Sequence, residues 1–258
     1  GLVLGIVLVV GAMILQAGGD MAGLIQFVNI TSIMIVLGGT MASTAIGFRI
    51  NEIVRVFTLV KFVVTKPKFM LYELVKELTE AAEIYRKGPT ELEKHLPNVK
   101  SFFIKDGLTF IANGIKYDDL KTILLQREKF RYSRESHESD LMKTLGMFSP
   151  AFGMIGTLIG LIFMLNNMGG GAEAMGNIGP SMGVALITTF YGSLFASLLF
   201  NPFSEKLKLR NQENSQAHQL MITGILLIWQ KRHQIDVQDQ LTAYIEPKDR
   251  LLHFKDEE

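Results

Sequence analysis

Long apolar runs without charge alternate with polar segments along this chain of 258 residues. A helix that crosses a bilayer needs about 20 mostly apolar residues. Four runs come close to or exceed that length, at residues 1–17, 27–48, 144–168 and 178–203. The pattern predicts an all-α membrane protein with four transmembrane helices. A secretory signal peptide is the competing interpretation of the first run, but neither a positive n-region nor a small-x-small cleavage site accompanies it.

The polar segments also have helical spacing. Apolar side chains recur at i, i+3, i+4 and i+7 from Leu71 to Ala82. Gly88-Pro89 should end that helix, and Thr90 should cap the next one, with Glu93 three residues on. Helices are also expected at 99–115 and 118–135, and residues 204–230 should extend the fourth span. The apolar stretch Leu220–Trp229 is only ten residues long, which indicates a packed face and not a fifth span.

These patterns divide the chain into four parts. They are transmembrane helices 1 and 2 at 1–48, a cytoplasmic helical domain at 49–143, transmembrane helices 3 and 4 at 144–203, and a cytoplasmic C-terminal helix and tail at 204–258. The connections 18–26 and 169–177 contain no Lys or Arg, whereas the other side is flanked by Arg49, Arg55, Lys61, Arg127, Lys129, Arg131, Arg134, Lys143, Lys206, Lys208 and Arg210. The positive-inside rule therefore predicts that both termini are cytoplasmic.

Composition narrows the function class. Hydrophobic residues make up 48% of the chain, charged residues 20%, and the mean hydropathy is +0.26, which argues against an ordinary cytosolic enzyme. Cysteine is absent, which excludes disulfides, thiol catalysis and thiolate metal sites. The net charge of +1 provides no basic field for nucleic acid. No phosphate-binding, nucleophile or metal-ligand motif occurs, so no catalytic residue, metal or cofactor is expected.

None of the four runs contains Asp, Glu, Lys, Arg or His. Such residues usually mark ion relays inside a membrane. If this chain moves ions, a partner must supply the titrating or ion-binding charge. The chain offers hydroxyl groups instead, above all Thr157 in the third span and Thr188 and Thr189 in the fourth. The alternative is that these hydroxyls bond to carbonyls of their own helix or hold helices together.

Small residues and prolines mark the third and fourth spans. Gly153, Gly156 and Gly160 line one side of the third span. Small side chains at four-residue spacing allow helices to approach closely, as at Gly156 and Gly160 in the third span and at Gly179 and Gly183 in the fourth. So many close faces predict an oligomer. Pro150 and Pro202 lie near the cytoplasmic ends of the two spans, where each can kink its helix and act as a hinge or simply begin or end it.

Four sequence motifs of this chain resemble motifs of one protein family and occur in the same order along the chain. They are Ser149-Pro-Ala-Phe-Gly-Met-Ile-Gly-Thr-Leu-Ile-Gly-Leu161, Ile178-Gly-Pro-Ser-Met-Gly-Val-Ala-Leu-Ile-Thr-Thr-Phe-Tyr-Gly192, Ser32-Ile-Met-Ile-Val-Leu-Gly-Gly-Thr40 and Lys248-Asp-Arg-Leu-Leu252. The chain resembles, over nearly its whole length, the MotA/PomA stator subunits of the bacterial flagellar motor. The resemblance implies a homopentamer in the bacterial inner membrane, around a dimer of a MotB/PomB-type subunit that supplies an essential transmembrane Asp. Ion flow would then turn the ring against the rotor protein FliG.

The same resemblance assigns roles to particular residues. It places the family prolines on Pro150 and Pro202, and the rotor-facing charges on Arg86, Lys87, Glu91 and Glu93. Pro89-Thr90 shortens the family's spacing by about one residue, so either glutamate can be the counterpart, and Glu93 is favoured. A solvated helix face is the alternative for these charges.

The coupling ion is expected to be sodium in preference to the proton. Thr157 resembles sodium-type members, whereas Asn29 stands where those members carry Asp. Two other functions remain open: an ExbB/TolQ-type energiser, whose relatives have three spans and an external N-terminus, and a passive oligomeric membrane scaffold that would conduct no ions.

Overall fold

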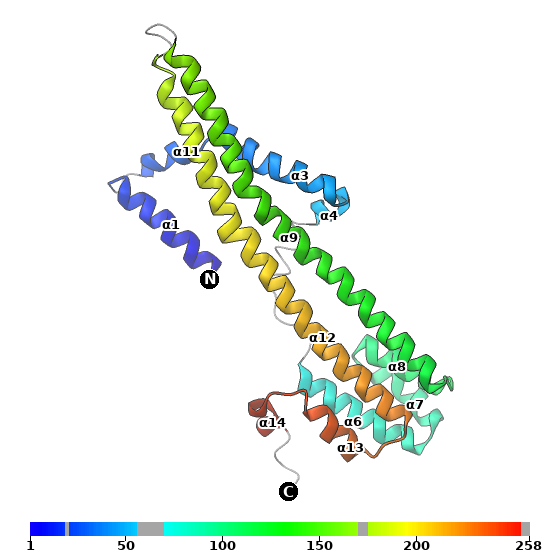
Figure 1. Cartoon of the computed structure of the whole chain (residues 1–258). Helices are drawn as coiled ribbons and strands as arrows, with labels where there is room; N and C mark the ends of the chain where they lie inside the picture. Colours follow the sequence, from blue (N-terminus) through cyan, green and yellow to red (C-terminus); the bar gives the residue numbers. More distant parts are fainter. Residues whose placement is uncertain (19–20, 56–69, 170–174, 254–258) are drawn as a thin grey trace. The chain divides into compact units, whose positions relative to one another are not determined.

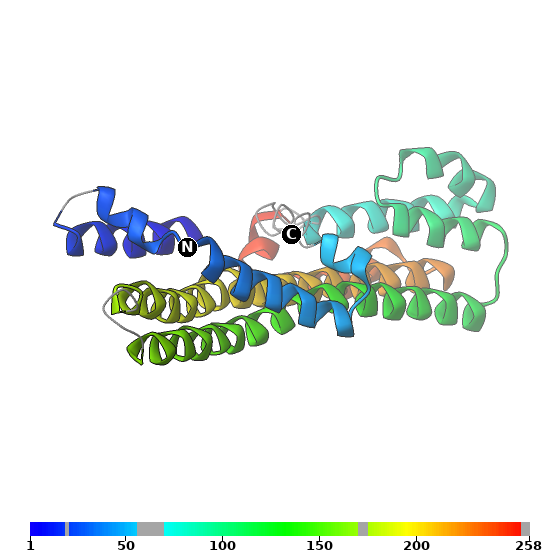
Figure 2. The ribbon, with the colours of Figure 1, turned by 90° about the horizontal axis from the view of Figure 1, so that it is seen from above.

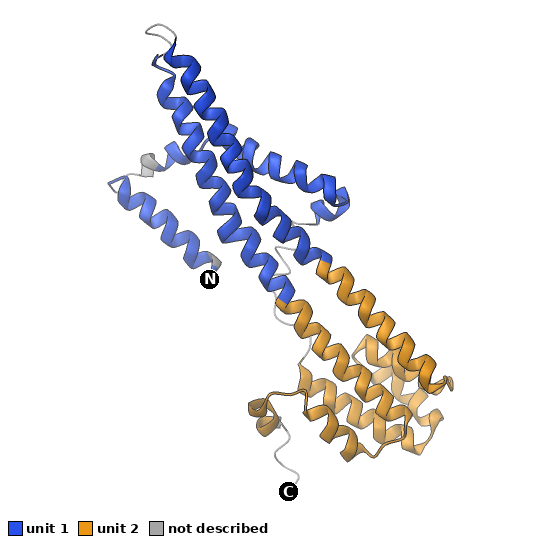
Figure 3. Ribbon diagram, viewed as in Figure 1, with its two compact units in different colours: residues 1–65, 137–208 blue, residues 66–136, 209–258 orange. Residues whose placement is uncertain are grey.

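The computed structural model describes residues 1–18, 21–55, 70–169 and 175–253, and every element within them is helical. Two compact units are distinguished (Figure 3): unit 1 contains residues 1–65 and 137–208, and unit 2 contains residues 66–136 and 209–258. Lys61, one of the expected flanking cations, lies outside the described residues.

Unit 1 is built on two long antiparallel helices (Figures 1 and 2). The first is the membrane part of α9, which runs from Tyr117 to Met168. The second begins as α11 (Ile178–Leu194), continues as the π-helix η4 (Phe195–Phe200) and passes into α12 (Asn201–Trp229). The expected extension of the fourth span is therefore present, and the helices expected at 118–135 and 144–168 are one continuous helix.

The second span is one helical run of three pieces. It consists of α2 (Ile30–Ile33), the π-helix η2 (Met34–Gly38) and α3 (Gly39–Gly47), and the short α4 (Ile50–Val54) follows. Its buried residues Ser32, Val36, Thr40 and Thr44 repeat every four positions. Within α4, Ile53 packs in an apolar cluster with Leu141, Met142, Leu145, Phe203 and Leu207. One face of the second span is thus buried against the long helices.

The first run forms a shorter helix than expected. Helix α1 (Leu2–Gln16) has 15 residues, which corresponds to about 22 Å at 1.5 Å per residue. The hydrocarbon core is about 30 Å thick. Only three described helical segments are long and apolar enough to cross it, namely Leu24–Gly47 and the apolar parts of Tyr117–Met168 and Ile178–Trp229. Of the four helices predicted to be this long, three are found among the described residues, whereas α1 ends at Gln16, before Gly18 turns the backbone to a positive φ.

Unit 2 surrounds the ends of the long helices with short ones. They are α6 (Leu71–Lys87), α7 (Pro89–His95), the 3-10 helix η3 (Leu96–Asn98), α8 (Phe102–Ala112), α13 (Gln234–Thr242) and α14 (Pro247–His253). Their apolar faces share one core, in which Leu78, Leu108, Leu124 and Ile225 are fully buried. Leu220, Ile225 and Ile228 belong to this core, which confirms that Leu220–Trp229 is a packed helix face.

The helix that follows Gly88 begins earlier than predicted from the sequence. Gly88 has a φ of 134°, which a side chain would strain, and it ends α6 as expected. The next helix begins at Pro89 with Gly88 as its N-cap, so Thr90 does not cap it. The fixed φ of proline suits the first position of a helix, and this preference outweighs the capping ability of a threonine one residue later.

A polar cluster holds α9 against α12 within unit 2. The Arg131 guanidinium donates to both carboxylate oxygens of Glu128 at 2.7 Å and pairs with Glu135 at 2.6 Å. Burial works against the charge of Arg131, but these two carboxylates leave its pKa raised. Ser215 and Asn211 on α12 bond to the same ion-pair network. Because each buried charge has a partner, the cluster avoids the cost of an isolated one.

His218 is buried beside this cluster. Burial lowers the pKa of His218, and the positive charge of Arg131 lowers it further. The hydrogen bond from its ring to the Asn214 carbonyl (2.8 Å) and the charges of Glu128 and Glu135 oppose that shift but do not overcome it. The nearest Glu128 oxygen is 3.8 Å away, too far for a hydrogen bond. The folded protein therefore favours neutral His218.

This burial predicts acid sensitivity. As the pH falls below about 6.5, the unfolded chain takes up a proton that folded His218 resists, so stability is lost until the pH passes the lower folded pKa. We expect His218→Gln to reduce the fall in Tm of the purified protein between pH 7.5 and pH 5.5. The same change at exposed His137 should leave the fall unchanged. An equal effect of both substitutions would contradict this assignment.

Close packing of α9 on α11 gives a second prediction. A Cβ at Gly160 would lie 2.7 Å from the Ser181 carbonyl oxygen and 2.8 Å from the Ala185 backbone nitrogen, and backbone atoms cannot move aside easily. We expect Gly160→Ala to destabilise the fold by about 1–3 kcal/mol, seen as a lower Tm. Gly183→Ala is the control, because a Cβ there meets no atom within 4 Å. A Tm that falls equally in both variants would refute the contact.

Candidate functional site

Three glycines bring the third and fourth spans into contact. α9 and α11 run side by side (Figures 1 and 2). A Cβ at Gly153 would lie 3.0 Å from the Thr188 carbonyl oxygen, and one at Gly156 would lie 2.5 Å from Thr188 Cβ. Gly160 makes the contact with Ser181 and Ala185 described above. Gly183, the fourth residue of the predicted packing pattern, lies on α11 but takes no part in this contact.

The close approach joins two threonine hydroxyls across the helix pair. Thr157 Oγ1 lies 3.1 Å from the Gly153 carbonyl oxygen on its own helix and 3.1 Å from the Ala185 carbonyl oxygen on α11. It also hydrogen-bonds to Thr189 Oγ1, which in turn lies 3.4 Å from the Gly153 oxygen. Thr157 is half-buried and Thr189 is exposed. The pair therefore opens on one face of the two helices.

This arrangement gathers four oxygen atoms around two hydroxyl protons. Each hydroxyl can donate only one hydrogen bond, yet it can accept two. Lone pairs are therefore in excess, and clusters of hydroxyl and carbonyl oxygens are the kind of ligand that hard cations prefer. The cluster carries no formal charge. It can complete the coordination of a monovalent cation but cannot balance its charge.

Thr188 does not join this pair. Its Oγ1 donates within its own helix, with the Val184 and Ala185 carbonyl oxygens both at 2.9 Å. Adjacent helical residues point about 100° apart, so the fully buried Thr188 packs over Gly156 while Thr189 reaches the exposed face. The structure thus brings together two of the three predicted hydroxyls and assigns the third to helix packing.

The two prolines occupy different helical settings. Pro150 lies inside the unbroken helix α9, and the preceding residue Ser149 donates its hydroxyl to the Gly192 carbonyl oxygen of α11 at 3.1 Å. Pro202 lies in the first turn of α12, directly after the π-helix η4. Both helices continue through their prolines, and the hinge role stays a prediction.

The predicted rotor-facing charges lie together around Gly88. Arg86 and Lys87 are in the last turn of α6, and Glu91 and Glu93 are in α7; all four are exposed. Lys87 pairs with Glu83 at 3.1 Å, and Glu91 pairs with Lys94 at 2.7 Å. Glu93 forms no ion pair with any residue that the structure describes. Of the two glutamates, Glu93 is thus the one whose charge is open to a partner.

Two polar residues of the second span, Asn29 and Thr40, were not predicted as site residues from the sequence. Asn29 caps α2 by accepting a hydrogen bond from the Ser32 backbone N–H at 2.9 Å. An Asp at this position could accept the same capping hydrogen bond. Thr40 Oγ1 is fully buried without a hydrogen-bond partner among the described residues. Neither residue has a chemical signature that spacing alone would reveal.

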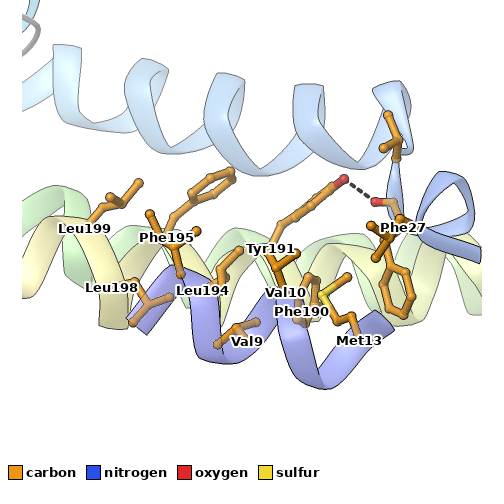
Figure 4. Close-up of a pocket in the computed structure, with 13 residues that line it drawn as sticks. Val9, Val10, Met13, Phe27, Phe190, Tyr191, Leu194, Phe195, Leu198 and Leu199 are labelled. Carbon is orange, nitrogen blue, oxygen red and sulfur yellow. Dashed lines mark hydrogen bonds between the residues drawn. The ribbon is translucent and has the colours of Figure 1, made fainter. Parts of the chain in front are cut away.

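An apolar pocket of about 390 Å³ lies between α1, the 3-10 helix η1 (Met21–Phe27) and the fourth span (Figure 4). Phe190, Tyr191 and Phe195 line one side, and Val9, Val10 and Met13 of α1 line the other. The single polar contact drawn there is the Tyr191 hydroxyl donating to the Phe27 carbonyl oxygen. The pocket offers no group for chemistry. Within the described residues, no three His, Asp or Glu side chains converge to hold a metal.

Comparison with known proteins defines the class. The sequence profile of the MotA/TolQ/ExbB proton channel family matches residues 95–219. Motility protein A of Borreliella burgdorferi is 30% identical over 241 residues, covering 93% of this chain and 91% of that protein. Chemotaxis protein PomA of Vibrio alginolyticus is 28% identical over 258 residues, covering 98% and 96%. The chain belongs to the MotA/TolQ/ExbB proton channel family.

A solved structure narrows the class further. The structure of the flagellar MotAB stator complex from Bacillus subtilis contains a chain that is 25% identical, with a TM-score of 0.83 and 98% of both chains covered. With the similarity to Motility protein A and PomA over nearly the full length, this places the chain among the flagellar motor stator subunits of the MotA/PomA type. It is a membrane protein of an ion-channel family and not of an enzyme class.

Proposed function

We propose that this chain forms the outer wall of an ion path whose charged group comes from a MotB/PomB-type partner. The observation that carries the proposal is that uncharged membrane helices present a cluster of oxygen atoms suited to a cation. The spanning segments contain no Asp, Glu, Lys, Arg or His, yet α9 and α11 present a neutral oxygen cluster on an exposed face. A cation in hydrocarbon needs a counter-charge. An aspartate on a partner helix beside Thr157 and Thr189 would supply it.

The proposed mechanism uses the ion to release the partner helix. When the partner aspartate is ionised, the Thr157 and Thr189 hydroxyls can donate to it, which holds one subunit in place. Binding of the ion neutralises the carboxylate, weakens that contact and lets the ring advance to the next subunit. One charge crossing 100 mV releases about 2.3 kcal/mol, which is sufficient to exchange a few hydrogen bonds.

The proposed assembly rests on the resemblance to the MotA/PomA stator subunits. We propose five copies around a partner dimer in the inner membrane, with both termini and unit 2 in the cytoplasm. Helix α1 would serve as a fourth, short span, because a helix below the full bilayer thickness can be accommodated by local thinning. The charges around Gly88, with Arg86, Lys87 and Glu93 exposed, would meet the rotor protein FliG.

Sodium is favoured as the coupling ion. Four oxygens around Thr157 suit a cation that exchanges its hydration shell for protein ligands. A proton path requires only a carboxylate and water. At the position that departs from sodium-type members, Asn29 accepts a capping hydrogen bond that an Asp could also accept. Similarity over nearly the full length to Motility protein A favours the stator over an ExbB/TolQ-type energiser or a passive scaffold.

Thr157 is the residue that tests this proposal. In cells whose swimming depends on this stator, we expect Thr157→Ala to reduce speed at limiting external sodium several-fold at fixed pH, while membrane levels stay normal. Thr157→Ser, which keeps the hydroxyl, should restore most of the sodium dependence.

The matched control lies on the same helix. Thr144 also has a hydroxyl, but it donates to the Asp140 carbonyl oxygen at 2.9 Å outside the pair. Thr144→Ala should therefore leave the sodium dependence unchanged. If Thr157→Ala and Thr144→Ala cells swim alike across the sodium range, the hydroxyl pair is only a packing contact.

A further inference from the structure

The exposed face that carries Thr189 continues as a polar stripe. Ser193, Ser197 and Asn201 follow at successive four-residue intervals, and all three are exposed. On the other side of Thr189, the exposed residues at similar spacing are Leu186 and Met182. The face is therefore apolar up to the hydroxyl pair and polar from there to the end of the span.

The serines of this stripe differ from the other hydroxyls of the same span. Ser181 and Thr188 each donate to the carbonyl four residues earlier, at 2.9 Å, which satisfies them within their own helix. Ser193 and Ser197 have no hydrogen-bond partner among the described residues. A hydroxyl that faced hydrocarbon without a partner would be unfavourable, so this stretch of the helix should face water or polar groups.

The π-helix η4 keeps these side chains in line. In an α-helix, a spacing of four residues overshoots a full turn by about 40°, so four such positions would spread over about 120°. η4 covers residues 195–200 and has more residues per turn, because its hydrogen bonds run from i to i+5. The wider turn removes most of that overshoot between Ser193 and Asn201. Because of η4, Ser193, Ser197 and Asn201 lie on the same face of the fourth span as Thr189.

The polar stripe contacts α9 through Asn201, its last residue. The Asn201 side chain lies over Gly146, where a Cβ would overlap with its Oδ1 and lie 3.0 Å from its Cγ. Pro150 has no N–H to donate to the Gly146 carbonyl oxygen, the usual acceptor four residues earlier. Lys206 and Lys208 follow on α12. Polar groups thus extend without interruption from the Thr157–Thr189 pair to the charged end of the helix.

We propose that Thr189, Ser193, Ser197 and Asn201 form the water-lined exit by which a monovalent cation leaves the hydroxyl pair for the cytoplasm. The inference rests on the proposed function and adds a direction and a lining to it. The ion moves along this polar face of the fourth span, partly hydrated, with serine hydroxyls replacing lost water. The apolar stretch at Leu186 and Met182 does not offer such a route.

The absence of cysteine from this chain allows a direct test. Ser193→Cys, Ser197→Cys and Leu198→Cys are each co-expressed with a cysteine-free partner, and inverted membrane vesicles are treated with a charged, membrane-impermeant methanethiosulfonate. Leu198 is the matched control, because it is adjacent to Ser197 but lines the apolar pocket against α1. We expect thiols at 193 and 197 to react at least tenfold faster than the thiol at 198. Similar rates at all three positions would overturn the proposal.

A flux measurement separates this inference from the proposed function. Replacing both serines by alanine should lower sodium flux at saturating sodium several-fold without moving the half-saturating concentration, because the Thr157 site is intact. Ser181→Ala is the control. If wild type conducts sodium only with its partner but the double variant conducts equally well, the exit is refuted and the proposed function stands. If wild type conducts no sodium with its partner, the proposed function itself fails.

Discussion

The contact between α9 and α11 is the constraint on which the membrane part depends. Only glycines at 153, 156 and 160 let the two backbones approach closely enough for Thr157 to reach both Thr189 and the Ala185 carbonyl oxygen. That contact gathers oxygens without charge. If this wall guides a cation, as we propose, the carboxylate that holds and releases the cation belongs to another molecule. The division of labour in a stator complex follows from this property.

Much of the fold could be predicted from the sequence because its signals are local. Hydropathy located the long spans, apolar periodicity located α6, and Gly88 with Pro89 marked the junction to α7. Helix boundaries were predicted less accurately where neighbouring residues compete for the same capping or first-turn position. Pro89 displaced Thr90 from the helix start, and the first run formed a helix of 15 residues, too short to count as a span by length alone.

The site was predictable only in outline. Spacing placed Thr157, Thr188 and Thr189 on adjacent spans, but the register between two helices decides which hydroxyl faces which. That register is set by backbone contacts at Gly153 and Gly160, and it buries Thr188 while leaving Thr189 exposed. The π-helices η2 and η4 have no sequence signature of this kind. Even so, η4 determines which residues of the fourth span share a face with Thr189.

The central claim is that the chain supplies uncharged walls and a partner supplies the acid. Sodium uptake into vesicles that contain this chain alone, compared with vesicles that contain it with a MotB/PomB-type partner, tests it most directly. The account predicts uptake only when both are present, and its loss when the partner's transmembrane aspartate is replaced by asparagine. Sodium conduction by this chain alone would contradict it.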